Sequence, residues 1–304
     1  MQVDRPDIGE RDDPLAAVVS TPDPVGRSVL VGLVGAGIQH SRTPRMHELE
    51  GTRLGLRYVY KLLDIEQLEL TPDALPSLLD AARICGFAGL NVTHPFKQAI
   101  LPLLDEVSPE AAAIGAVNTV VFAGTRRIGH NTDCWGFAEG FRRGMEDARI
   151  GRVVLFGAGG AGTAVARALL DLGVGELLIH DTLDDRAVAL ASSLASEFGS
   201  HRVRAATASE AALTDADGLV NATPMGMAGY AGMPVSADAL RPDLWVADIV
   251  YFPLETELLR TARQRGCRTL SGAGMALYQA VRAFELFSGI RPDAEHMRRH
   301  FGAD

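Results

Sequence analysis

The sequence predicts an α/β protein of two domains: an N-terminal substrate domain with a mostly parallel sheet, and a Rossmann-type, doubly wound dinucleotide-binding domain. Three observations lead to this prediction. The chain has 304 residues, more than one hydrophobic core usually supports. Apolar strand-like runs alternate with amphipathic helical stretches, the order that produces parallel sheets covered by helices. A glycine-rich loop follows one of the strands in the second half of the chain.

The predicted elements of the first half follow one another from Val29. We expect strands over residues 29–35, 57–65 and 87–93, alternating with helices over residues 43–56, 75–86 and 96–107. The pattern of residues 115–133 predicts a hairpin with its turn at residues 123–127. We expect a helix to follow over residues 134–146.

The second half of the chain continues the alternation. Strands are expected over residues 152–156, 176–181, 203–207, 218–223, 244–251 and 267–272, with helices that include residues 161–173 and 255–266. The last two helices, residues 274–289 and 293–301, are expected to fold back onto the first domain. The predicted substrate domain therefore comprises residues 28–133 and 274–304, and the dinucleotide-binding domain comprises residues 134–273. Residues 1–27 are expected to form a mobile tail.

Composition and charge argue against several classes of partner. A net charge of −9 and a pI near 5.4 argue against nucleic acid, which requires a basic surface. No apolar run approaches the ~18 residues of a membrane-spanning helix, and the acidic, proline-containing first 25 residues differ from a signal peptide. The three widely separated cysteines predict neither a disulfide framework nor a zinc site. We therefore expect a cytoplasmic monomer or homodimer with a small-molecule substrate and no nucleic-acid or membrane partner.

The loop after residues 152–156 has the spacing of a dinucleotide-binding motif. Gly157, Gly159 and Gly162 form GxGxxG between a predicted strand and a predicted helix. The first glycine permits a tight turn, the second lets the backbone approach a pyrophosphate, and the third lets the helix pack on the strand. Because the helix N-terminus offers free N–H groups to an anion, we expect cofactor contacts from the whole loop, which also contains Ala158, Gly160 and Ala161.

Asp181 predicts the kind of cofactor. It ends the next predicted strand, close to the ~20-residue spacing at which an acid bonds the adenosine ribose. A carboxylate there accepts from a 2′-hydroxyl and repels a 2′-phosphate, so NAD is favoured over NADP. Two alternatives remain: Asp181 as a helix cap, and Arg186 as a phosphate partner, which the neighbouring Asp184 and Asp185 disfavour.

Lys97 and Asp133 are the candidates for moving the proton of a substrate hydroxyl. Hydride transfer to a nicotinamide requires such a group within hydrogen-bond reach of the substrate oxygen. Lys97 lies near a predicted helix start, where the macrodipole disfavours a cation. From the residues alone two alternatives stay open: Lys97 as an exposed lysine whose stem covers Phe96, and Asp133 as a simple helix N-cap.

Ser41 and Thr43 precede Pro44, a residue suited to the first position of a helix. Two hydroxyls beside a helix N-terminus can receive a carboxylate, although an ordinary helix cap explains the same residues. Because His40, His47, His94 and His130 lack metal-binding spacing, we expect no metal and assign these histidines to hydrogen-bonded or solvent-facing positions.

Nine motifs, in order along the chain, resemble the shikimate dehydrogenase family, and within it the quinate/shikimate dehydrogenases of actinobacterial type. The resemblance runs from about Val31 to the C-terminus. Its motifs are SRTPRMHELEG, NVTHPFKQ, LPLLDEVS, GAVNTVV, GHNTD, GAGGAG, NATPMGM, DIVYFPLETELL and MALYQAVRAFELFSG.

The resemblance implies a role for each matching residue. Lys97 and Asp133 would form the catalytic pair, and Ser41, Thr43 and Tyr251 would hold the substrate carboxylate. The substrate's ring hydroxyls would be bonded by five further polar residues: Asn91, Thr93, Asn118, Thr132 and Gln279. On the nicotinamide side the cofactor would meet Thr223, Pro224, Met225 and Gly274, although methionine is also a common core residue.

Two departures from the family pattern refine the function implied. Ser41-Arg42-Thr43-Pro44 replaces the usual Ser-x-Ser-Pro and resembles enzymes that also accept quinate. His180-Asp181-Thr182 replaces the Asn-Arg-Thr motif of NADP users. The resemblance therefore implies NAD-dependent oxidation of quinate or shikimate to the 3-dehydro ketone. The alternatives are an NADP-dependent biosynthetic shikimate dehydrogenase, and a non-catalytic sensor on the same fold, against which the intact Lys97 and Asp133 argue.

Overall fold

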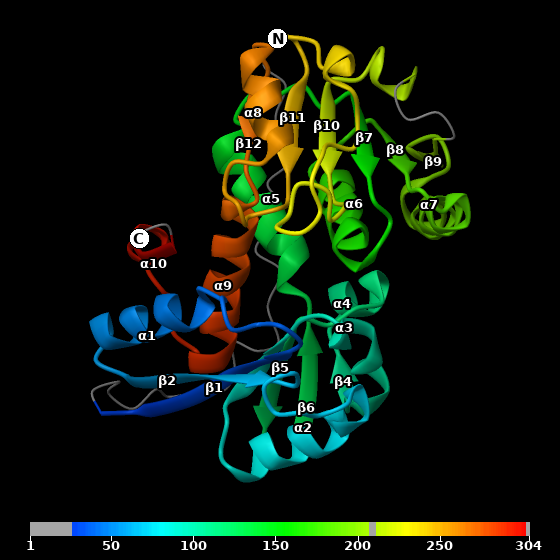
Figure 1. Ribbon diagram of the computed structural model, residues 1–304. Coiled ribbons are helices and arrows are strands. Elements are labelled where there is room, and N and C mark those ends of the chain that lie inside the picture. Colours follow the sequence, from blue (N-terminus) through cyan, green and yellow to red (C-terminus); the bar gives the residue numbers. More distant parts are fainter. Residues whose placement is uncertain (1–25, 207–210, 302–304) are drawn as a thin grey trace, which may run out of the picture.

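The computed structural model describes residues 26–206 and 211–301, which contain two six-stranded sheets (Figure 1). The first sheet has the strand order β2-β1-β3-β5-β6-β4. Its strands are β1 (Ser28–Gly35), β2 (Arg57–Asp64), β3 (Gly89–Val92), β4 (Glu106–Val107), β5 (Thr119–Ala123) and β6 (Arg126–His130). Strands β2, β1 and β3 run parallel, whereas β5 is antiparallel to both β3 and β6, so the sheet is mostly but not wholly parallel.

The predicted hairpin is confirmed as β5 and β6, with a turn shorter than expected. Ala123 pairs with Arg126, so only Gly124 and Thr125 lie between the strands. Gly124 has a φ of 64°, a left-handed conformation that glycine adopts without strain. The last two residues of the predicted tail, Gly26 and Arg27, are hydrogen-bonded to Gly55 and to the first residue of β2. Arg27 O accepts from Arg57 N at 3.0 Å, and Gly26 N donates to Gly55 O. Residues 1–25 of the predicted tail lie outside the described residues.

The helices of the first half are α1 (Thr43–Arg53), α2 (Leu75–Ile84), α3 (Phe96–Ala99) and α4 (Pro109–Ile114). The helix predicted over residues 96–107 is wrong. It is a single turn, α3, followed by a 3-10 turn at Leu101–Leu103 and by β4. Pro102 explains the interruption, because proline has no N–H and its ring clashes with the carbonyl four residues earlier. The prediction also missed β4 and α4.

The second sheet is fully parallel, with the order β12-β11-β10-β7-β8-β9. Its strands are β7 (Arg152–Phe156), β8 (Glu176–His180), β9 (Val203–Ala205), β10 (Gly218–Asn221), β11 (Trp245–Asp248) and β12 (Arg268–Leu270), and its helices are α6 (Gly160–Asp171), α7 (Asp184–Phe198) and α8 (Glu257–Gln264). The chain winds outward from β7 in one direction and from β10 in the other, so the strand order reverses between them. The predicted doubly wound sheet is confirmed.

Two long helices connect the sheets (Figure 1). These are α5 (Thr132–Gly144) and α9 (Ala273–Ser288), which pack along each other. Their backbones approach closely at glycines: a β-carbon at Gly136 would lie 2.7 Å from Gln279 N, and one at Gly140 would lie 3.1 Å from the Gly274 carbonyl carbon. The predicted domain boundary at residues 133/134 therefore falls in the first turn of α5.

The last helices return to the first sheet, as predicted. In α9, Phe284 stacks on Tyr58 of β2 with ring centroids 4.9 Å apart, and Phe287 joins the same buried cluster. α10 (Ala294–Phe301) lies against α1, where Glu50 accepts from Asp293 N at 2.7 Å.

Candidate functional site

Most of the predicted site residues lie where strands of the two sheets end. Asn91 is the second-last residue of β3 and Thr132 follows β6, while Gly157, Asp181 and Tyr251 follow β7, β8 and β11. Loops at the carboxyl ends of parallel strands meet at one edge of a sheet, and in a doubly wound sheet the crevice lies where the strand order reverses. This rule explains why residues far apart in the sequence form one site.

Lys97 and Asp133 form an ion pair. Lys97 Nζ donates to Asp133 Oδ2 at 2.6 Å, and the two side chains are 28% and 10% exposed. The pair is therefore open to solvent mainly through the lysine. The capping alternative for Asp133 is wrong because Asn131 caps α5: its Oδ1 accepts from the backbone N–H groups of Asp133 and Cys134. The alternative of Lys97 as an exposed surface lysine is also wrong, because its side chain is only 28% exposed and its ammonium is bound by the Asp133 carboxylate.

Three of the residues predicted to bond ring hydroxyls form a buried polar chain. Asn118 Oδ1 accepts from Thr132 N at 2.8 Å, and Asn118 Nδ2 donates to Thr132 Oγ1 at 3.0 Å. Asn91 Oδ1 accepts from Tyr60 Oη at 2.7 Å, which holds the Asn91 amide in one orientation. All three predicted residues are at most 5% exposed. Amides and hydroxyls held in place by hydrogen bonds therefore lie buried near Asp133, which follows Thr132 in the chain.

Ser41 and Thr43 lie at the start of α1 and are both half-buried. Ser41 Oγ accepts from Thr43 N at 3.4 Å, a weak bond that leaves both hydroxyls able to turn toward an anion. Thr93 and Gln279 are also half-buried; Gln279 Nε2 donates to Ala276 O within α9.

Tyr251 lies close enough to the ion pair to interact with it electrostatically. Desolvation raises the pKa of Tyr251, the positive charge of Lys97 lowers it and the carboxylate of Asp133 raises it. The Tyr251 side chain is 49% exposed. That Tyr251 shares one site with Lys97 and Asp133 stays a prediction.

The glycine loop has the geometry of a pyrophosphate receptor. Gly157 has a φ of 101°, and a β-carbon at Gly162 would lie 2.0 Å from Gly157 O. By contrast, a β-carbon at Gly159 or Gly160 would meet no atom within 4 Å, although both are glycines. Ala158, Gly160 and Ala161 surround this space at the N-terminus of α6. The protein itself thus leaves room for a ligand above a helix N-terminus.

Asp181 stabilises the same loop. Its Oδ2 accepts from Ala158 N at 2.7 Å and its Oδ1 from Leu183 N at 3.0 Å. Desolvation acts to raise the pKa of Asp181, but these two N–H bonds and the charge of Arg186 outweigh it, so the pKa is lowered. Asp181 is therefore a fixed negative charge beside the glycine loop. Arg186 is exposed on α7.

Thr223, Pro224 and Met225 follow β10 and lie beside the glycine loop. A β-carbon at Gly157 would lie 2.7 Å from Ala222 O, so this segment borders the turn. Pro224 and Met225 are exposed, which excludes the alternative of Met225 as core filler. Gly274 lies against Gly140, and a β-carbon at Gly274 would be in ordinary van der Waals contact with the Gly140 Cα at 3.4 Å, so helix packing alone does not require a glycine there.

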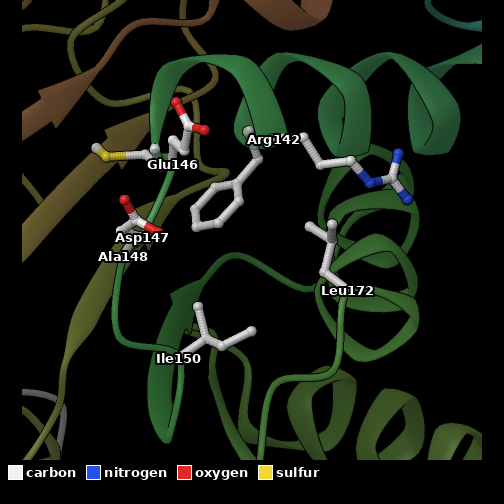
Figure 2. A pocket seen from close by; sticks show the side chains of 8 residues that line it. Arg142, Glu146, Asp147, Ala148, Ile150 and Leu172 are labelled. Atoms are coloured by element: carbon white, nitrogen blue, oxygen red, sulfur yellow. The ribbon is translucent and has the colours of Figure 1, made fainter. Parts of the chain in front are cut away.

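Two cavities lie apart from the Lys97–Asp133 ion pair and the glycine loop, although one of them borders the Ser41–Thr43 segment through Pro44. One, of about 270 Å³, lies at the far end of α5 between Arg142, Ile150 and Leu172 (Figure 2). The length of α5 separates it from Asp133 by roughly 18 Å. Another, of about 410 Å³, lies beside β2 near Pro44, Lys61 and Asp64. Neither contains Lys97 or the glycine loop, so we assign the site by its polar residues and not by cavity size.

Other chemistry finds little support in the described residues. They contain no cluster of His, Cys, Asp and Glu side chains that fits a metal ion. In the same part of the chain, no helix is long and apolar enough to cross a membrane. Cys134 is buried next to Asp133, and burial raises the pKa of its thiol to about 12, so it stays protonated at neutral pH.

Comparison with known proteins identifies the family. The model of the shikimate dehydrogenase substrate binding domain matches residues 33–120, and that of the shikimate 5′-dehydrogenase C-terminal domain matches residues 272–300. A shikimate dehydrogenase (NADP(+)) of Streptomyces avermitilis is 56% identical over 272 residues, 89% of this chain and 94% of that protein. The chain belongs to the shikimate dehydrogenase family. It is thereby an NAD(P)-dependent oxidoreductase.

Relatives within the shikimate dehydrogenase family differ in cofactor. A quinate/shikimate dehydrogenase (NAD(+)) of Corynebacterium efficiens is 51% identical over 90% of this chain and 98% of its own length. The solved structure of a quinate dehydrogenase from Corynebacterium glutamicum in complex with NAD has a TM-score of 0.86 and 48% identity, covering 90% of this chain and 99% of that one. Similarity alone therefore leaves the choice between NAD and NADP to the residues of the site.

Sequence reasoning missed several residues that shape the site. Asn131 was not among the predicted site residues, although an Asn directly before a helix is a common N-cap signal. Tyr60, which orients Asn91, gives no local signal because the two residues belong to different strands. Asn221 and Asp248, paired across neighbouring strands, were likewise missed.

Proposed function

We propose that this protein oxidises quinate and shikimate to their 3-dehydro ketones with NAD as the hydride acceptor. The observation that carries the proposal is the 2.6 Å Lys97–Asp133 ion pair beside the buried Asn118–Thr132 amide and hydroxyl pair. Such a site suits a cyclic polyhydroxy acid. An analogue that lacks a hydroxyl would leave buried donors and acceptors of the protein without a partner and would therefore bind less well. The cytoplasmic location and the domain limits at residues 28–133 with 274–304 and 134–273 form part of the same proposal.

Lys97 is proposed to move the proton of the hydroxyl that is oxidised. When bound, the nicotinamide accepts the hydride from the carbon that carries this hydroxyl. Lys97 Nζ lies at the open side of the ion pair and can reach a substrate oxygen while Asp133 holds its other side. Asp133 would position Lys97 and accept a proton from its ammonium, so that the neutral Nζ can take up the hydroxyl proton and the net transfer is from the substrate hydroxyl to Asp133.

The remaining polar residues are proposed to orient the substrate. Ser41 and Thr43, at the start of α1, and Tyr251 would hold the carboxylate. Hydroxyls of the ring would bond to the polar side chains of Asn91, Thr93, Asn118, Thr132 and Gln279. Since the side chains of Asn91, Asn118 and Thr132 are already held by hydrogen bonds, these three lose little entropy when the substrate binds.

The cofactor proposal rests on Asp181 and the open glycine loop. The space at Gly159 and Gly160 fits a pyrophosphate at the N-terminus of α6, and Ala158, Ala161 and Gly162 complete that loop. The lowered pKa of Asp181 keeps a negative charge where a ribose 2′-substituent would lie. Thr223, Pro224, Met225 and Gly274 would line the nicotinamide side. The Streptomyces relative named for NADP supports a second candidate, an NADP-dependent shikimate dehydrogenase.

The test is the initial rate of nicotinamide reduction with quinate and with shikimate, each against NAD and NADP. We expect NAD to give the higher kcat/KM with both acids. A preference for NADP together with no turnover of quinate would instead establish the second candidate.

A further inference from the structure

Two exposed loops meet at the site. The cofactor-side loop, residues 222–230, follows β10, and the substrate-side loop, residues 249–255, follows β11. Strands β10 and β11 are parallel neighbours, with Asn221 in register with Asp248. Large apolar side chains stay exposed on both loops: Met225, Met227 and Tyr230 on the first, and Tyr251, Phe252 and Leu254 on the second. The loops also touch directly, since Ala228 N donates to Phe252 O at 3.4 Å.

Asn221 holds the cofactor-side loop from beneath. Its Oδ1 accepts from Thr223 N at 3.0 Å and from Thr223 Oγ1 at 2.6 Å. Its Nδ2 donates to Met225 O at 3.1 Å and to Asp248 Oδ1 at 3.0 Å. With a side chain that is 0% exposed, Asn221 connects its own loop to the neighbouring strand.

Asp248 holds the substrate-side loop in the same way. Its Oδ1 accepts from Val250 N at 3.0 Å, and its Oδ2 accepts from Thr256 Oγ1 at 2.6 Å. Asp248 and Thr256 bracket residues 249–255 and are each 1% exposed. The hydrogen bond between them therefore closes the loop that carries Tyr251.

We infer that the buried network of Asn221, Asp248 and Thr256 couples the two loops. Cofactor binding to the cofactor-side loop then also orders the substrate-side loop, which favours binding of the substrate. Asn221, Asp248 and Thr256 are positioning residues, acting through Thr223, Met225 and Tyr251. The inference rests on the proposed function, which assigns those three residues to the ligands. Because two ligands that order a shared element favour each other's binding, the network predicts positive coupling between cofactor and acid.

Thr256→Val is the variant that opens the network. Valine has the shape of threonine without the hydroxyl, so the loop loses its bond to Asp248 while its packing is kept. The same hydroxyl accepts from Leu259 N at 3.3 Å as the N-cap of α8. Thr256→Ser restores both bonds and serves as the rescue. Ser108→Ala removes a comparable N-cap bond, 3.3 Å from Ala111 N, at α4, and controls for general destabilisation.

The experiment measures the dissociation constant of shikimate by calorimetry, with and without saturating NADH. Shikimate and NADH are both reduced, so they cannot react with each other. For the wild type, Thr256→Ser and Ser108→Ala we expect NADH to tighten shikimate binding about 5-fold or more. For Thr256→Val we expect this factor to fall below about 2-fold. The inference is wrong if NADH tightens shikimate binding as much in Thr256→Val as in the wild type. It is also wrong if the wild type binds both ligands without coupling. A wild type that binds neither ligand overturns the proposed function as well.

Hydrogen exchange on the wild type tests the network even where a variant does not fold. NADH alone, without shikimate, is expected to slow amide exchange in residues 249–255 as well as in residues 222–230. Slowing confined to residues 222–230 would contradict the inference, because it would show the two loops responding separately.

Discussion

Gly159→Ala separates cofactor binding from folding. Gly159 has a φ of −79° and a ψ of −172°, which alanine adopts readily, and a β-carbon there meets no atom within 4 Å. The protein alone therefore does not require glycine at this position. If the loop holds a pyrophosphate, the added methyl group occupies the path of the phosphates.

The expected magnitudes follow from this geometry. Alanine lowers the entropy of the unfolded chain, which stabilises the fold by about 0.4–1 kcal/mol. It is also a poorer N-cap than glycine for α6, which costs up to about 1 kcal/mol. The two effects nearly cancel, so we expect the melting temperature to move by no more than about 2–4 °C. Loss of one charge-assisted phosphate bond weakens NADH binding by about 1.5–3 kcal/mol, roughly 10-fold to 150-fold.

Gly162→Ala is the matched control within the same loop. Its β-carbon would lie 2.0 Å from Gly157 O, a backbone atom that cannot rotate away. We expect a loss of stability of about 3 kcal/mol or more, together with loss of binding.

The assay is thermal unfolding combined with titration of NADH fluorescence for both variants. Wild-type NADH affinity in Gly159→Ala would refute the placement of the pyrophosphate. A Gly159→Ala variant as unstable as Gly162→Ala would refute the claim that the space at Gly159 is kept for a ligand.

Three further predictions concern charged and titratable groups. Lys97→Ala is expected to lower kcat about 10²-fold to 10⁴-fold with unchanged NADH affinity, because only proton transfer is lost; steady-state kinetics would contradict this if turnover stayed near the wild-type value. Asp181→Asn should raise the ratio of kcat/KM for NADP to that for NAD, because the variant no longer repels a 2′-phosphate. The expected change corresponds to roughly 1–4 kcal/mol, the repulsion of two charges about 4 Å apart. An unchanged ratio would exclude a contact between Asp181 and the ribose. Burial lowers the pKa of His47 from 6.5 to about 3, so the unfolded state binds more protons between these values and stability falls as pH drops through this window. At pH 5 the free energy of unfolding should be roughly 2 kcal/mol lower than at pH 7. In urea unfolding, His47→Gln should not show this loss. Equal dependence of stability on pH in the two proteins would contradict the prediction.

Local sequence patterns predicted most elements because they act over a few residues. Residues 153–156 are apolar and include two β-branched valines, and with Arg152 they form β7 with the predicted bounds. The glycine loop is predictable for the same reason, since its turn, its open space and its helix packing all arise within six residues of chain. Pro102 shows the converse, because apolar periodicity suggested one helix where a single proline divides the segment.

Local sequence patterns were sufficient to predict two α/β domains, the dinucleotide-type loop, the acid that follows β8 and the polar candidates for the site. How those candidates pair depends on the tertiary structure. Lys97 and Asp133 are 36 residues apart and meet because α3 and the start of α5 lie at the same edge of the first sheet. Asn221 and Asp248 are 27 residues apart and meet because β10 and β11 are neighbours in register. Contacts of this kind depend on strand order, and strand order is set by the packing of the whole chain and not by the preferences of any one segment.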